Sequence, residues 1–199
     1  NIDTTFVNGR LAKHYGGTLE QQYNTAGPSD SDRAWHAVSG LHEAGRGGLF
    51  GMAVILTKNS AGERTSPVKR GFWSVHHLLG QHFPPPPADV PELPASENTA
   101  TKTIRELLAA HVADAQCARC HTHFDGLGLA MEAFDPIGRS RTTDAAGRPI
   151  DNRAELPNGE FATGIPGLIE YIEQHRRQDF VRTMCHKFLG YALGRSVSL

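Results

Sequence analysis

The residues best suited to chemistry are the two cysteines and the histidine of the run Cys117-Ala118-Arg119-Cys120-His121. Two residues between the cysteines let both thiols reach the vinyl groups on one edge of a haem and form thioether bonds. The histidine that follows then lies under the iron, where a neutral imidazole is a good axial ligand. The pattern predicts one covalent haem c, attached through Cys117 and Cys120, with His121 as the proximal iron ligand. We expect the second ring nitrogen of His121 to donate to a backbone carbonyl.

Other uses of a Cys-x-x-Cys pair agree less well with the surrounding sequence. A redox disulfide of the thioredoxin type follows a strand, whereas residues 107–110, Leu-Leu-Ala-Ala, are typical of a helix. A zinc site needs a second ligand pair, and although His123 is near, the sequence has no second Cys-x-x-Cys. The third cysteine, Cys185, makes the count odd, which argues against a disulfide framework, and we expect it to be buried in an amphipathic helix.

The ligand on the other side of the iron decides what a haem does. A Met or His there gives an electron carrier, whereas an empty position lets the iron bind peroxide or oxygen. We favour Met184, which lies on an apolar stripe of the last predicted helix, although a core methionine is as typical there. His111 and Met131 are weaker candidates, and another part of a precursor is a further source. Arg139 and Arg141 are predicted partners of the haem propionates, with solvated surface arginines as the alternative.

Apolar spacing predicts mainly helical structure around this motif. Helices are expected, in chain order, over 6–15, 48–57, 68–79, 103–114 and 167–193. The last pattern is the strongest, because Phe180, Met184, Phe188 and Ala192 recur on one face. The polar segment 16–31 is predicted to be a loop.

Four consecutive prolines, Pro84–Pro87, followed by Pro91 and Pro94, predict a stiff extended strap. We take the strap as a domain boundary. Residues 1–83 are then a helical scaffold region, 84–100 a proline-rich linker and 101–199 a small helical c-type cytochrome domain. The predicted fold class is mainly α.

Composition and chemistry restrict the partners and the location. The 199 residues carry a net charge of -1, so no basic surplus indicates nucleic acid as a partner. No apolar run reaches the roughly 18 residues of a transmembrane helix. Because bacteria attach haem c outside the cytoplasmic membrane, we expect a periplasmic or otherwise extracytoplasmic protein. The chain starts with Asn1 and not Met, which suggests a removed leader or a start within a longer polypeptide.

Seven segments carry a resemblance that reaches beyond the Cys-x-x-Cys-His motif. They are Arg46–Leu49, Thr65–Trp73, Pro84–Pro87, Cys117–His121, Gly128–Arg139, Glu155–Gly159 and Lys187–Arg195. In this order they resemble the C-terminal region of planctomycete-type multidomain cytochromes, whose neighbouring modules are called domains of unknown function. The resemblance implies a large secreted precursor, of which this chain would be a fragment or a processed subunit. One departure is Phe124-Asp125-Gly126, where that family usually has Asp-Pro in the last two positions.

Three functions are compatible with these features. The leading hypothesis is a one-electron-transfer module within or beside a larger exported redox enzyme. It would pass electrons between a soluble electron carrier and either a partner redox subunit or the rest of the precursor. The first alternative is a catalytic haem of the peroxidase or oxygenase type, with an open distal site. The second is a scaffold or binding subunit of a redox complex. Trp35 and Trp73 are the first residues to examine for such a role, although core positions are more typical of both.

Overall fold

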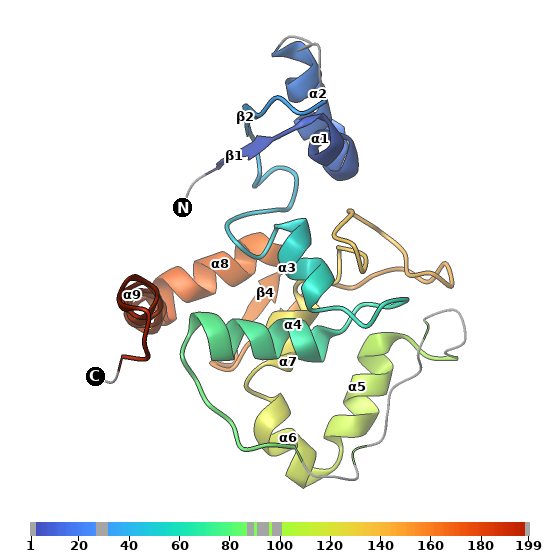
Figure 1. Cartoon of the computed structure of the whole chain (residues 1–199). Coiled ribbons are helices and arrows are strands. Elements are labelled where there is room, and N and C mark those ends of the chain that lie inside the picture. The colour runs from blue at the N-terminus through green and yellow to red at the C-terminus, as the bar shows by residue number, and fades with distance from the viewer. Residues whose placement is uncertain (1–2, 27–31, 87–89, 91–95, 97–100, 198–199) are drawn as a thin grey trace.

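The computed structural model describes residues 3–26, 32–86, 90, 96 and 101–197, and it is mainly helical with two small antiparallel sheets (Figure 1). In chain order the elements are β1 (Thr4–Val7), α1 (Gly9–Tyr15), α2 (Gly17–Thr25), β2 (His36–Ser39), α3 (Ala53–Lys58), α4 (Pro67–Trp73), the π-helix η1 (Ser74–Leu78), α5 (Ile104–Val112), α6 (Ala115–His121), α7 (Asp125–Leu129), β3 (Arg153–Glu155), β4 (Phe161–Thr163), α8 (Gly164–His175) and α9 (Arg177–Leu193). The prediction of a mainly α fold is confirmed. Among the described residues, no helix has both the length and the apolar character that crossing a membrane requires.

Two hydrophobic cores divide the chain at a place the sequence did not indicate. The smaller core lies between β1, α1, α2 and β2 and ends at Leu41. The larger core begins at Phe50 and runs to Ile172, and it includes Val75 and Leu78 of η1 together with Leu127 of α7. The elements before and after the proline strap therefore share one core, because their apolar faces are buried against each other. The cores separate between residues 41 and 50 and not at the predicted linker.

The predicted strap is described only in part. Pro84–Pro86 are exposed and lie outside any helix or strand, as expected for consecutive prolines. Residues 87–89, 91–95 and 97–100, which include Pro91 and Pro94, lie outside the described residues.

The crossing of α4 and α7 organises the larger core, and Figure 1 shows the two helices side by side. Glycines let their main chains touch. A Cβ atom at Gly71 would lie 1.9 Å from the carbonyl oxygen of Phe124, and one at Gly128 would lie 1.8 Å from that of Pro67. No side chain fits at such distances, so these two glycines set how closely α4 and α7 approach.

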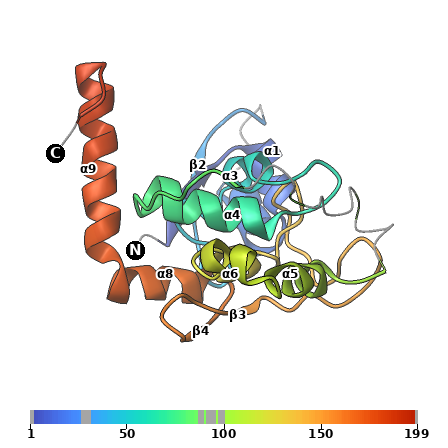
Figure 2. The same ribbon diagram turned by 90° about the horizontal axis from the view of Figure 1, so that it is seen from below.

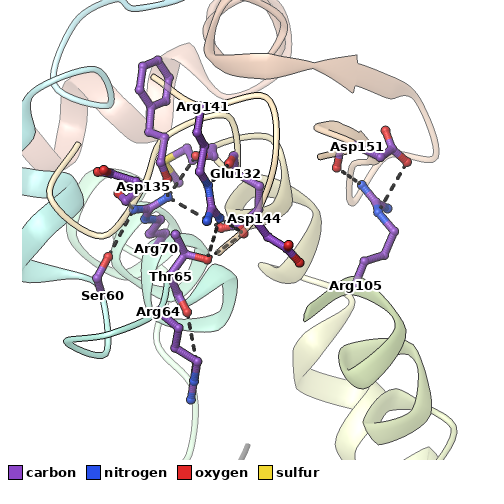
Figure 3. A network of polar contacts seen from close by, with 12 residues as sticks. Ser60, Arg64, Thr65, Arg70, Arg105, Glu132, Asp135, Arg141, Asp144 and Asp151 are labelled. Atoms are coloured by element: carbon purple, nitrogen blue, oxygen red, sulfur yellow. Dashed lines mark hydrogen bonds and ion pairs between the residues drawn. The ribbon is translucent and has the colours of Figure 1, made fainter. Parts of the chain in front are cut away.

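A buried charged network ties α4 to the segment that follows α7 (Figure 3). The Arg70 guanidinium donates to the carbonyl oxygens of Met131, Phe134 and Asp135 at 2.8–2.9 Å. The carboxylate of Glu132 lies 3.6 Å from Arg70 Nη1, and both side chains are almost fully buried. Since a buried charge without partners is costly, this network constrains the position of the whole segment.

Arg46 joins the two cores. Its guanidinium lies over the ring of Tyr15 from the smaller core, at 4.0 Å, and over the ring of Phe134 from the larger, at 4.6 Å. It donates to the carbonyl oxygens of Gly51 and Gly138 at 2.7 and 2.6 Å. Burial lowers the pKa of Arg46 to about 10, which still leaves it charged at neutral pH.

Several predicted elements differ from those observed. Residues 4–7 form β1 and not the start of a helix, because they pair with β2. Residues 17–25, predicted as a loop, form α2, whose apolar side packs in the smaller core. The helix expected over 48–57 begins only at Ala53, after a series of turns. The pattern over 167–193 contains two helices, which meet at Arg176.

Helix α9 leaves the core along its length, and Figure 2 shows it projecting from the rest of the molecule. Of its predicted buried stripe, Phe180 and Met184 pack against the larger core, whereas Phe188 is 70% exposed. Cys185 is exposed, so the prediction that it is buried is wrong. Trp35, also predicted to be a core residue, is 60% exposed, because it lies outside both cores.

Candidate functional site

The Cys-x-x-Cys-His motif forms most of α6. The side chain of Asp114 caps this helix by accepting a hydrogen bond from the backbone N–H of Gln116. Cys117 and Cys120 are three residues apart on the helix, so their side chains share one face. Both are free thiols and partly exposed, which leaves both sulfur atoms available for reaction.

His121, the last residue of α6, is held by a carboxylate. Its Nδ1 lies 3.0 Å from each carboxylate oxygen of Asp125, and the two side chains are only 16% and 12% exposed. A carboxylate accepts hydrogen bonds, so the Nδ1 proton faces Asp125 and the lone pair is on Nε2. Among the described residues, the hydrogen bonds of this ring are those of Nδ1, and none is made by Nε2. The expectation of a backbone carbonyl as the partner of Nδ1 is wrong, because α7 starts one helical turn later and places Asp125 beside the ring.

The imidazole of His121 is enclosed by two other rings. The ring of Phe124 lies 4.9 Å away between centroids, and His111 of α5 contacts it edge to face, also at 4.9 Å. Two imidazoles that ligate one iron from opposite faces need centroids about 6 Å apart, from two metal–nitrogen bonds of about 2 Å and the ring radii. In this structure His111 therefore lies beside His121 and not across an iron from it.

The two methionine candidates lie elsewhere. Met131 is buried in the larger core, 1% exposed. Met184 packs against the same core from α9, and both views show α9 well apart from α6 (Figures 1 and 2). The structure therefore does not bring α9, which carries Met184, next to the motif.

The two arginines predicted as propionate partners have other surroundings. The Arg141 guanidinium donates to the carboxylate of Glu132 at 3.0 Å and to the hydroxyl of Thr65 at 3.1 Å (Figure 3). A buried carboxylate requires a cation nearby, which explains why this arginine points into the network. Arg139 is exposed, and its backbone N–H donates to the side chain of Asp135 in a turn.

The sequence analysis missed a cluster of rings that continues from His121 towards η1. We call it the ring cluster, and it comprises Phe72, His76, His77, His82, Phe83, His123 and Phe124. Phe124 contacts Phe72 at 5.8 Å, and Phe72 stacks on His76 at 5.2 Å with 10° between their planes. The only signal in the sequence was the density of His and Phe over residues 72–83. His76 and His77 belong to the π-helix η1, an element that often marks a functional site.

Within the ring cluster, His76 resembles His121 in that its Nδ1 is the nitrogen that makes a hydrogen bond. Its Nδ1 lies 3.1 Å from the carbonyl oxygen of Gln81. Within the described part of the chain, its Nε2 has no hydrogen-bond partner. It is therefore a further histidine with one nitrogen available to a ligand.

The donors around α6 match the demands of a covalently attached haem. Attachment needs two thiols on one face and an imidazole with one free nitrogen, and Cys117, Cys120 and His121 supply these. Phe124, which contacts His121, also contacts the exposed ring of Phe72 and the half-buried ring of Phe83. These rings offer apolar surface for a macrocycle. In the part of the chain described, no three His, Cys, Asp or Glu side chains are grouped to hold a metal ion. The residues present thus fit a haem through a single axial nitrogen.

Comparison with protein families gives a match to the middle part of the chain, which contains this site. Residues 46–144 match the PSCyt3 family, described as a protein of unknown function (DUF1588). The PSCyt3 match begins near the start of the larger core and includes α3, α4, η1 and α5 to α7, with the whole Cys-x-x-Cys-His motif. No curated protein and no solved structure matches the chain. The expected resemblance is confirmed at the level of a domain-of-unknown-function family.

Proposed function

We propose that this chain carries one covalently attached haem c and acts in one-electron transfer within or beside a larger exported redox enzyme. The observation that supports this most is the arrangement of α6: two free thiols on one face, followed by an imidazole whose Nδ1 is fixed by a carboxylate and whose Nε2 has no partner. Bound there, the haem would supply a one-electron iron couple, and the protein would supply its ligand and surroundings.

The chain's own residues have defined tasks in this proposal. Each thiol, Cys117 and Cys120, adds across one vinyl double bond, with sulfur bonding to one carbon and the thiol hydrogen going to the other. This addition is balanced without an oxidant. His121 offers Nε2 to the iron, and Phe124 shields the imidazole from water. An apolar surrounding of this kind limits solvent access, which is one of the ways a protein tunes a reduction potential.

The partners follow from the same chemistry. A soluble electron carrier and the remainder of a larger precursor, or a separate redox subunit, would exchange electrons with the site. Because bacteria attach haem c outside the cytoplasmic membrane, the proposal includes a periplasmic or otherwise extracytoplasmic location. The smaller core, residues 3–41, contributes no side chain to the contacts of His121, which suits a docking or scaffold role for that part.

One observation favours a catalytic haem as a second candidate. The carboxylate of Asp125 on Nδ1 makes His121 a stronger electron donor. A stronger donor stabilises iron in its higher oxidation states, which suits reaction with peroxide or oxygen if the distal position is open. The occupant of the distal position thus separates the two candidates.

Covalent attachment is tested on the full chain produced in a bacterial host that assembles haem c. We expect the intact mass to show one haem and the colour to stay with the polypeptide in acid–acetone. The double variant C117A/C120A should lose both signs. The matched control is Cys185→Ala, which removes the exposed cysteine of α9 and should keep the haem. A wild-type chain without a mass increment of haem size would refute the proposal.

The distal position is tested next by spectroscopy on the loaded protein. A carrier should show a low-spin spectrum that does not change when cyanide or peroxide is added. A high-spin spectrum that shifts at once on adding cyanide would favour the catalytic candidate and reject the carrier. Repeating the measurement with Met184→Ala and His76→Ala shows whether either side chain is the sixth ligand.

A further inference from the structure

The carboxylate of Asp125 has one evident task in the structure, which is to hold the ring of His121. We infer that Asp125 is a positioning residue that sets the donor strength of His121 and thereby lowers the reduction potential of the iron. This inference rests on the proposed haem site. Both oxygens lie 3.0 Å from Nδ1, and the residue is 9% exposed. The imidazole is the partner that the structure gives this buried charge.

The main chain on both sides of Asp125 is fixed by close packing. On one side, the carbonyl oxygen of Phe124 lies against Gly71 of α4, where a Cβ atom would be 1.9 Å away. On the other side, Gly126 lies against the carbonyl oxygen of Glu155 in β3, where a Cβ atom would also be 1.9 Å away. The backbone of Asp125 is thus held between α4 and β3, with its carboxylate on the His121 imidazole.

The same packing requires a glycine at position 126, next to the carboxylate. A proline ring carries a Cβ atom, and the carbonyl oxygen of Glu155 occupies that place. Glycine lets β3 approach the start of α7 closely, which closes the site around the carboxylate.

The effect on the iron follows from charge. A carboxylate that accepts the Nδ1 proton increases the electron density on Nε2, and this stabilises ferric iron more than ferrous iron. Removing the charge therefore favours the ferrous state and raises the potential. Loss of such a partner typically changes metal binding 10- to 100-fold. If ferric binding loses about tenfold more than ferrous binding, the midpoint potential rises by about 59 mV for one electron.

The experiment compares midpoint potentials of the loaded full chain with Asp125→Asn and Asp125→Glu. Asn keeps the size and accepts a hydrogen bond without a charge, so its potential should rise by about 59 mV or more. Glu restores the charge and should return the potential towards the wild-type value. The matched control is Asp144→Asn, since Asp144 is also a shielded aspartate in an i,i+4 pair, with Arg148 at 2.6 Å. Its potential should not move.

The outcomes separate this inference from the proposed function. An Asp125→Asn protein that carries haem and keeps the wild-type potential would overturn the role of Asp125 and leave the haem proposal intact. A wild-type chain without covalent haem would overturn both. Should Asp125→Asn fail to fold, the midpoint potential of Asp125→Ser, which also lacks the charge, decides in its place. We expect a raised potential there too, and a wild-type value would reject the inference.

Discussion

Replacing Glu132 by Gln tests whether the network around it is structural or serves a cofactor. Glu132 is 2% exposed, and its carboxylate accepts hydrogen bonds from Thr65 at 2.7 Å and from Arg141 at 3.0 Å. Gln has nearly the same volume but no charge, and its amide hydrogens would face the donors of Arg70 and Arg141. The change therefore removes the anion and leaves two cations in a buried place.

The magnitude follows from the burial of the pair. Arg70 and Glu132 expose only 1% and 3% of their side chains, and removing one partner of such a pair costs about 3–5 kcal/mol. A domain has about 5–15 kcal/mol of stability in total, so a large share would be lost. For a chain of this size, 1 kcal/mol shifts the melting temperature by about 2–4 °C, which gives a fall of roughly 6–20 °C.

Urea and thermal unfolding followed by circular dichroism measure this loss. The control is Asp151→Asn, which breaks the ion pair of Asp151 with Arg105, at 3.4 Å and with the aspartate 64% exposed. That variant should change the free energy of unfolding by less than about 1 kcal/mol. The loss in Glu132→Gln should appear in the haem-free chain as well. If its free energy of unfolding lies within 1 kcal/mol of the wild type, the structural role of the network is refuted.

Three further predictions concern packing, pH and the contact between the cores. Gly128→Ala should cost about 3 kcal/mol or more in urea unfolding, since a Cβ atom there overlaps the main chain of α4, whereas Gly190→Ala in exposed α9 should cost nothing. Burial is the main cause that lowers the pKa of His77 below 6.5, and neighbouring basic side chains lower this pKa further. The contribution of neutral His77 to stability is therefore complete above pH 6.5 and is lost as the pH falls below that value. Melting curves of His77→Gln at about pH 5 and pH 7.5 should then differ less than those of the wild type. Arg46→Lys should lose about 2 kcal/mol or more in urea unfolding, because an ammonium group cannot reproduce the two hydrogen bonds and ring contacts of the guanidinium.

Local signals predicted the elements that local interactions form. Thr103 and Glu106 make a capping box at the start of α5, where the sequence predicted a helix from residue 103. Ser66 caps α4 with Pro67 in its first turn, close to the predicted start. In each case the stabilising contact lies within three residues, so the sequence contains the whole cause.

Elements and roles that depend on distant partners were not predictable in this way. Residues 4–7 are a strand because they pair with β2, where Thr4 meets Ser39, 35 positions along the chain. No local pattern shows that pairing. Arg141, predicted as a propionate partner or a solvated arginine, instead joins a buried network that includes Thr65, 76 positions away. Even the contact of His121 with Asp125, only four residues apart, depends on the turn between α6 and α7.

The two cores change how the motif must be understood. A cytochrome domain cut at the proline strap would lose Phe50, Leu56, Val75 and Leu78 from the larger core. It would also lose α4, whose Gly71 holds the carbonyl oxygen of Phe124 next to the carboxylate that fixes His121. The geometry of His121 therefore depends on residues that precede the motif by more than 40 positions. The match to the PSCyt3 family, which starts at residue 46, agrees with this, because it too keeps α4 and the motif together. The unit that could present an iron ligand is thus the whole larger core, including α8, and not the segment after the strap.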